Sequence, residues 1–272
     1  MLTLSPKTID LWLWQFDGEK LTIRSPHAKS CEESAPAEDR AERLKSLLTP
    51  EEQHYATGLG KSALRLRWTE ARAGLRRILA AYLDAQPGSQ PEPLRLERAP
   101  HGKPYLAGQD GQPHALQFNL SHTPNWCAVV VAKQMAVGVD IEQPRAISAR
   151  LWPRVLTPSE VTQMATLPAA EQTTAFLRSW TRKEALGKAE GQGLLPQLGR
   201  TETGLHRHDG LLAVTLGISA TESETWFLRE LPAKFSTNPP ANPLINPPLI
   251  GAIAASAPFE IVERDYSQLW LE

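Results

Sequence analysis

The hydrophobic and polar positions of this chain follow two patterns, one typical of strands and one typical of helices. Short runs that are rich in branched and aromatic residues, and are bounded by turn residues, predict strands. We expect strands at residues 9–16, 116–120, 126–132, 135–142, 211–216, 226–231 and 249–255. Because these runs are spread over the whole chain and have helical segments between them, both secondary structures should contribute to one fold.

Two long helices are expected between the strands. Apolar residues recur at helical spacing from residue 62 to 85, and residues 180–190 are good helix formers. Upstream of each helix stands a Thr-Pro sequence with a glutamate three residues after the threonine, at Thr49–Glu52 and at Thr157–Glu160. This combination is the capping box that starts a helix.

The order of these elements repeats along the chain. Each capping box is followed by a Trp-Thr helix, at Trp68 and at Trp180, and by further strands. This internal similarity predicts an α+β fold of two similar α/β halves about a pseudo-two-fold axis, each a small antiparallel sheet packed on a long helix. We assign residues 1–135 to the N-terminal half and residues 136–272 to the C-terminal half, which carries the metal and catalytic motifs. The functional site should lie between the halves.

Composition and charge exclude several classes of protein. The 272 residues carry a formal net charge of -1, which argues against a general nucleic-acid or membrane-surface binder. No segment approaches the length of a membrane span, and the N-terminus lacks the pattern of a signal peptide. Cys31 and Cys127 lie far apart and indicate neither a disulfide framework nor a zinc site. We expect a cytoplasmic protein that binds neither nucleic acid nor membrane.

Two acidic residues distinguish the strand predicted at 135–142. Asp140 and Glu142 are two positions apart, so their carboxylates project from the same face and repel each other unless a cation lies between them. Oxygen pairs of this kind suit Mg²⁺. An exposed polar face on an edge strand is the alternative, but the apolar neighbours Val137, Val139 and Ile141 favour a buried strand and therefore a cation.

The helix at 180–190 carries the next candidates. Glu184 and Lys188 follow Trp180 by four and eight positions, so the three side chains share one helix face. Taken alone, an exposed Glu–Lys pair is the simpler interpretation. The preceding sequence adds possible partners: Asp140, Glu142, the Ser121-His122 pair, and the Gly102–Pro104 turn around Lys103. Together they predict one site for a metal ion and a polyphosphate. The arginines of the helix at 62–85 form either a solvated face or a phosphate-binding row.

These residues belong to motifs that occur in a fixed order. The motifs are His101-Gly102-Lys103-Pro104, Phe118-Asn119-Leu120-Ser121-His122, Gly138-Val139-Asp140-Ile141-Glu142 and Trp180-x-x-Lys183-Glu184-Ala185-x-x-Lys188-x-x-Gly191-x-Gly193-Leu194. The series closely resembles the 4′-phosphopantetheinyl transferases of the Sfp type, over roughly residues 47–260. The resemblance implies a monomeric pseudo-dimer that transfers the phosphopantetheine arm of coenzyme A to a serine of an apo acyl or peptidyl carrier protein and releases adenosine 3′,5′-bisphosphate.

The resemblance also implies roles for individual residues. Asp140 and Glu142 would hold Mg²⁺, with Glu184 as a further ligand. Glu184 would accept the proton of the serine hydroxyl, and Lys188 would stabilise the departing phosphate. The residues expected to bind coenzyme A are Arg65, Arg67, His101, Gly102, Lys103, Asn119, Ser121 and His122.

The sequence departs from the family pattern in two places. Glu52, Gln53 and His54 stand where the family often has basic residues, so Arg65 or Arg67 would replace those in binding the 3′-phosphate. The proline-rich run at 236–248 predicts an exposed loop.

Two other classes of function use similar residues. A metal-dependent phosphohydrolase usually needs a second metal, for which the chain offers no further acidic pair or histidine cluster. A non-catalytic homologue that only holds coenzyme A would not need all four of Asp140, Glu142, Glu184 and Lys188.

Overall fold

The structure, a computed structural model, describes residues 2–16, 37–83, 94–191, 198–217, 223–236 and 248–270. The helices are α1 (Ala37–Ser46), α2 (Pro50–Gly58), α3 (Ser62–Leu83), α4 (Trp152–Val155), α5 (Pro158–Thr166), α6 (Ala169–Glu190) and α7 (Ala233–Ser236). The strands are β1 (Thr8–Gln15), β2 (Leu96–Arg98), β3 (Pro104–Leu106), β4 (Leu116–His122), β5 (Trp126–Lys133), β6 (Val137–Glu142), β7 (Leu212–Gly217), β8 (Ser223–Glu230), β9 (Ile250–Ala255) and β10 (Glu260–Arg264). Short 3₁₀ helices are η1 (Ala149–Leu151), η2 (Leu198–Arg200) and η3 (Tyr266–Trp270).

The elements expected from the sequence are present. All seven predicted strands form, and α3 and α6 are the two predicted long helices. Both capping boxes are complete, because each threonine side chain accepts from the glutamate N–H and each glutamate carboxylate accepts from the threonine N–H. The strand β10 and the hairpin β2–β3 were not predicted. Most of the proline-rich run, and Cys31, lie outside the described residues.

The strands form two four-stranded sheets and one separate hairpin. The first sheet has the order β10–β1–β5–β4, and the second has the order β6–β9–β8–β7. Every pairing is antiparallel except that of β10 with β1. The neighbouring strands β1, β5 and β4 of the first sheet correspond in order to β6, β9 and β8 of the second: in each set the strand that comes last in the chain lies between the other two. In both sets a capping-box helix and a long helix follow the first strand along the chain. The chain passes from the first sheet to the second between β5 and β6, and β10 returns to the first sheet.

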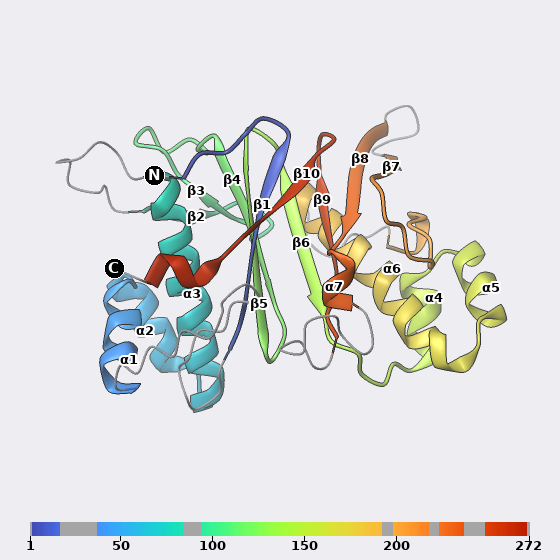
Figure 1. The fold of residues 1–272 in the computed structure, drawn as a ribbon, viewed down its shortest axis with the longest axis horizontal. Helices are drawn as coiled ribbons and strands as arrows, with labels where there is room; N and C mark the ends of the chain where they lie inside the picture. Colours follow the sequence, from blue (N-terminus) through green and yellow to red (C-terminus); the bar gives the residue numbers. More distant parts are fainter. Residues whose placement is uncertain are drawn as a thin grey trace.

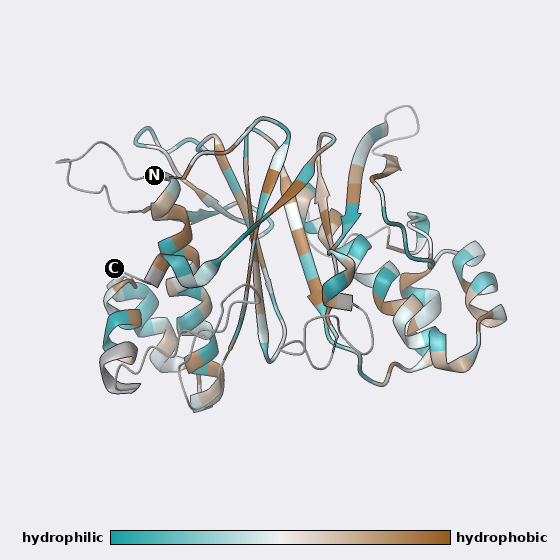
Figure 2. Cartoon of the chain, viewed as in Figure 1, coloured by the Kyte–Doolittle hydropathy of each residue, from teal (hydrophilic) through white to brown (hydrophobic). Residues whose placement is uncertain are grey.

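The two sheets lie between the two long helices, with α3 packed against the first sheet through a shared core and α6 against the second (Figure 1). Alternation along β1 explains this layering. Trp12 and Trp14 belong to the core shared with α3, whereas Leu11 and Leu13 belong to the core between the sheets. Figure 2 shows the apolar strands gathered in the middle of the molecule. The mixed α+β character expected from the sequence is thus confirmed.

The left-handed residue Gly191 ends α6, with φ at 89°. None of the helices in the described ranges is both long enough and apolar enough to cross a bilayer.

Candidate active site

The candidate site forms where β4, the last strand of the first sheet, lies beside β6, the first strand of the second sheet. Side chains of β4 bind the backbone of β6. Asn119 Oδ1 accepts from the N–H of Val139 at 3.0 Å, and Ser121 Oγ accepts from the N–H of Ile141 at 3.3 Å. Because both pairs are two residues apart on their strands, this pattern fixes the register between the sheets without backbone pairing.

Three of the predicted residues meet directly at this junction. The ammonium of Lys188 on α6 donates to Asp140 Oδ1 at 2.6 Å, to Ser121 Oγ at 3.2 Å and to the carbonyl of Val139 at 3.2 Å. Ser121 Oγ also donates to Asp140 Oδ1 at 2.9 Å. An ammonium has three donors, and here all three point at protein oxygens.

Two further carboxylates act on this cluster. Burial raises the pKa of Glu184, the negative charges of Asp140 and Glu142 raise it further, and the ammonium of Lys188 opposes them. Burial likewise raises the pKa of Asp140 and of Glu142. Three carboxylates whose pKa values are all raised form an electrostatically strained group, which a bound cation would relieve.

Two oxygens of this group are suited to a metal ion. Asp140 Oδ2 and Glu184 Oε1 are buried and have no hydrogen-bond partner among the described residues. Within those same residues, no three His, Cys, Asp or Glu side chains are grouped so that they could hold a metal ion by themselves. Mg²⁺ usually binds one or two protein carboxylates together with substrate phosphates, so a pair of carboxylate oxygens fits a magnesium ion that binds with a phosphate substrate.

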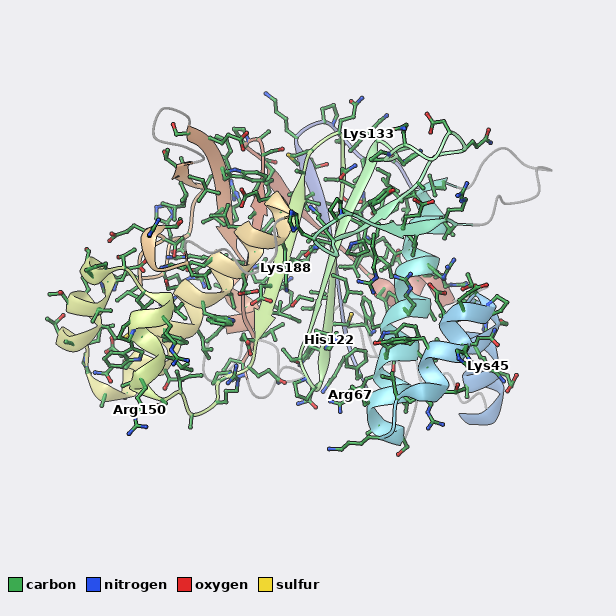
Figure 3. All side chains as sticks on the ribbon, turned by 180° about the vertical axis from the view of Figure 1, so that it is seen from behind. Lys45, Arg67, His122, Lys133, Arg150 and Lys188 are labelled. Atoms are coloured by element: carbon green, nitrogen blue, oxygen red, sulfur yellow. The ribbon has the colours of Figure 1, made fainter. Side chains whose placement is uncertain are left out.

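Basic residues continue from this cluster toward α3. Figure 3 shows Lys188 on α6, His122 at the end of β4 and Arg67 on α3 following one another on the same side of the molecule. Burial lowers the pKa of His122, and the charges of Lys188 and Arg67 lower it further. The ring of His122 also packs edge-on against Phe16, with 6.4 Å between ring centroids.

A pocket of about 810 Å³ opens beside this row. Arg65, Arg67 and Phe16 line it, together with residues of α1 and α2 and the turn at Pro124 and Asn125. Arg67 donates to the carbonyl of Pro124 at 3.3 Å, which places its guanidinium between α3 and that turn. The predicted arginines therefore lie at a pocket large enough for a sizeable part of a nucleotide-like ligand.

The predicted Gly-Lys-Pro turn lies at the C-terminal end of α6. Gly102 has φ at 87°, and His101 beside it is exposed. The ammonium of Lys103 donates to the carbonyl of Ala189 at 2.7 Å and to that of Val137 at 3.2 Å, and burial lowers its pKa to about 8. Lys103 thus binds the last turn of α6 in this structure and is not directed into the carboxylate cluster.

One residue of the site was not singled out from the sequence. The side-chain oxygen of Gln143 accepts from Thr123 Oγ1 and from Asn125 Nδ2, both at 3.1 Å. These bonds tie the turn after His122 to the end of β6. A polar residue directly after the acidic pair is the only signal in the sequence that could have pointed to it.

Residues 136–233 match the family model of the 4′-phosphopantetheinyl transferase superfamily. The 4′-phosphopantetheinyl transferase HetI of Nostoc sp. is 31% identical over 159 residues, which are 58% of this chain and 65% of the relative. The 4′-phosphopantetheinyl transferase Sfp of Bacillus subtilis is 31% identical over 123 residues, 45% of this chain and 52% of the relative. The resemblance to the 4′-phosphopantetheinyl transferase superfamily is confirmed. A third member, AcpT of Salmonella typhimurium, is 32% identical over 129 residues, 47% of this chain and 59% of the relative.

The match to the superfamily covers part of the candidate site. Asp140, Glu142, Glu184 and Lys188 fall within the matched range 136–233. Ser121, His122 and the arginines of α3 precede that range, and the chain spans between about half and two thirds of the length of these three relatives. The match to the superfamily model therefore bears most directly on the carboxylates and on α6.

Proposed function

We propose that this protein transfers the 4′-phosphopantetheine arm of coenzyme A to a serine of an apo acyl or peptidyl carrier protein. The serine oxygen forms a bond to the phosphorus that bears the arm, the bond from that phosphorus to the bridging oxygen breaks, and adenosine 3′,5′-bisphosphate leaves. The observation that carries the proposal is the meeting of Asp140, Glu184 and Lys188 at the junction of the sheets. These residues lie in the range that matches the superfamily.

Glu184 is the proposed general base. Its burial and its acidic neighbours raise its pKa above the ordinary value of 4.5, which strengthens it as a proton acceptor. The proton that the serine loses is transferred to this carboxylate.

Lys188 is the proposed stabiliser of the leaving phosphate. Its ammonium carries positive charge at the junction, where negative charge grows on the bridging oxygen as the bond breaks. Because its three donors bind protein oxygens in this structure, Lys188 must exchange at least one of these bonds to contact a phosphate.

Asp140 and Glu184 are the proposed ligands of Mg²⁺ with the best-placed oxygens, and Glu142 completes the set that the family resemblance implies. A bound magnesium ion would neutralise part of the charge of the pyrophosphate. The oxygens Asp140 Oδ2 and Glu184 Oε1 fit this role because both are buried without a partner in the described residues.

The proposed coenzyme A site extends from the carboxylates to the pocket beside α3. His122, Arg65 and Arg67 are the candidates with the best placement for phosphate groups, because they lie at or next to this pocket. His101, Gly102, Lys103, Asn119 and Ser121 complete the set that the family resemblance implies.

We further propose that the two sheet-and-helix units are halves related by a pseudo-two-fold axis, with a boundary near residue 135. The shared strand order of β1–β5–β4 and β6–β9–β8 supports this relationship. Because one chain then contains both halves of the site, the protein should act as a monomer in the cytoplasm and bind one coenzyme A.

The proposal is tested by incubating the protein with coenzyme A, Mg²⁺ and a panel of apo acyl and peptidyl carrier proteins. We expect at least one carrier to gain the mass of one phosphopantetheine arm. The same carrier with alanine in place of its acceptor serine should gain nothing, and excess chelator should stop the reaction. Hydrolysis of coenzyme A without any carrier would instead favour a phosphohydrolase, and binding of coenzyme A without either reaction would favour a non-catalytic homologue.

A further inference from the structure

A second pocket, of about 400 Å³, opens between the end of β8, the start of α7, the start of β10 and the segment 207–210. It shares no lining residue with the pocket beside α3. In Figure 1, β10 and α7 lie toward the viewer, whereas Lys188, His122 and Arg67 are labelled in Figure 3, which shows the molecule from behind. This second pocket is therefore separate from the candidate active site.

Arg229 lines this pocket and has no partner for its charge. Its Nε is buried and has no hydrogen-bond partner among the described residues, and none of the ion pairs within those residues includes its guanidinium. Alternation along β8 gives the reason. Leu228 and Glu230 face α6, so Arg229 between them faces the other way, as does Phe227, which packs against the core between the sheets.

The neighbouring carboxylate of Glu230 cannot neutralise Arg229, because three other arginines share it. Arg178 Nε lies 3.1 Å from Glu230 Oε1, and Arg182 donates to the same oxygen. Arg207 donates to Oε2 at 3.2 Å. Both oxygens of this carboxylate are therefore engaged on the side of β8 that faces α6.

The charges around the pocket do not balance. Arg207 also donates to Asp209 Oδ1 at 2.6 Å, and the exposed Glu260 is the remaining carboxylate in the lining. Together with the ion pairs of Glu230, four arginines are matched by three carboxylates, which leaves one positive charge. A ligand with a single negative charge would balance it, whereas a doubly charged phosphate would place a further negative charge near these carboxylates.

The rest of the lining suits a small carboxylate with an apolar part. A guanidinium binds a carboxylate through two parallel N–H donors. His208 Nδ1 accepts from the N–H of Gly210 at 3.3 Å, so the neutral ring carries its proton on Nε2 and offers another donor. Leu231 and Ile261 contribute apolar surface to the same pocket.

We propose that this pocket is a second ligand site, in which Arg229 binds the carboxylate of a small monocarboxylic acid. The apolar residues of the lining contact the remainder of the ligand. The inference goes beyond the proposed transfer reaction and does not depend on it, because the site uses none of the residues assigned to coenzyme A, the metal or the carrier serine.

Butyrate is a suitable probe, because it combines one carboxylate with a short apolar chain. In a ¹H–¹⁵N NMR titration of the whole protein, butyrate should cause saturable shifts of the Arg229 Nε–H and of the amides at 207–210 and 260–261. Arg229→Gln should weaken this binding by about 10–100-fold, because hydrogen bonds to a charged group are lost. Arg229→Lys keeps the charge without the two parallel donors, so it should bind with intermediate affinity. It also serves as the test if the glutamine variant does not fold.

Arg150→Gln is the matched control. Arg150 is exposed and does not line this pocket, so its replacement removes the same charge and should leave butyrate affinity at the wild-type value. Inorganic phosphate, titrated in the same way, should bind at the pocket more weakly than butyrate.

Butyrate binding that is lost in Arg229→Gln and retained in Arg150→Gln supports the site. Four results would overturn it: no saturable shift around the pocket, equal affinity in the wild type and Arg229→Gln, equal loss in both glutamine variants, or tighter binding of phosphate than of butyrate. None of these measurements involves coenzyme A or a carrier protein, so each outcome is independent of the transfer assay.

Discussion

The two capping-box units of this protein begin alike, but their buried glutamates are neutralised in different ways. Around α2 and α3, Glu52 pairs with Arg72 at 2.5 Å and with Arg76 at 2.7 Å, and both arginines come from the long helix. Around α5 and α6, Glu160 pairs with Lys183 at 2.5 Å, and both side chains have no exposed surface. Lys183 also donates to the carbonyls of Val155 and Leu198.

The difference shows how α6 can stabilise the fold and carry the candidate chemistry at once. Arg72 and Arg76 are four residues apart and share one face of α3, and both serve Glu52. On α6, Lys183 faces the capping box, and consecutive helical residues point in directions about 100° apart. Glu184 is therefore turned away from the capping box, and Lys188 lies one turn after it beside Asp140.

The comparison predicts that Glu184→Gln affects catalysis and leaves folding intact. The variant keeps its shape but loses its basicity, so turnover should fall by about 10²–10⁴-fold, equivalent to about 3–5 kcal/mol of barrier. Coenzyme A affinity should change much less. Single-carrier kinetics and calorimetric coenzyme A titration measure the two quantities. An equal loss of both would make Glu184 mainly a metal ligand.

The neighbouring residue should behave in the opposite way. Lys183→Met keeps most of the side-chain volume but leaves Glu160 as a buried charge without its cation, so the free energy of unfolding should fall by about 3–5 kcal/mol. Urea unfolding followed by circular dichroism measures it. Adding Glu160→Gln to the Lys183→Met variant should recover part of the lost unfolding free energy, because it removes the uncompensated charge. A loss of only about 0–1 kcal/mol, as for an exposed pair, would contradict the structural role of Lys183.

The corresponding change in the first unit should be milder. Glu52→Gln retains a residue that suits the capping box but removes the charge that Arg72 and Arg76 bind, for an expected cost of about 1.5–3 kcal/mol. Glu51→Gln, in the same turn but exposed and not paired with Arg72 or Arg76 by a salt bridge, is the matched control and should lower the free energy of unfolding less than Glu52→Gln. If Glu52→Gln lowered the free energy of unfolding more than Lys183→Met does, the expectation that the second unit depends more on its ion pair would be wrong.

The smallest expected effect is a difference between Glu52 and Glu184 in how their contributions to stability depend on pH. Arg76, Thr49 and Arg72 outweigh burial and lower the pKa of Glu52, so its contribution to stability is present above its ordinary pKa of 4.5 and is lost as pH falls through the lower folded value. Burial and acidic neighbours raise the pKa of Glu184, so its ionisation costs stability at neutral pH.

Glu184→Gln should therefore be slightly more stable than the wild type at neutral pH. This advantage should disappear as the pH falls through the raised pKa toward 4.5, where the wild-type carboxyl group becomes protonated. Thermal unfolding of both proteins over this pH range provides the measurement. A variant that is less stable than the wild type at neutral pH would show that Glu184 contributes a stabilising contact.

Much of the local structure could be read from the sequence because it depends on residues that are close together in the chain. A capping box needs only a threonine and a glutamate three residues apart, and both predicted boxes form. The spacing within β6 and within α6 likewise placed Asp140 with Glu142 and Glu184 with Lys188 on common faces. The strand β10 could not be predicted from the sequence because it has only five residues, and because its partner β1 lies near the other end of the chain.

The sequence by itself thus determined the helices, most strands and the candidate chemistry, since these follow from periodicity and short-range spacing. Only the tertiary structure decided which polar groups form hydrogen bonds within the protein. Lys103 binds backbone carbonyls, and Ser121, Asp140 and Lys188 come together from three different elements. A side chain's donors and acceptors look the same in the sequence whether they are used or available, because their partners are brought to them only when the sheets and helices pack.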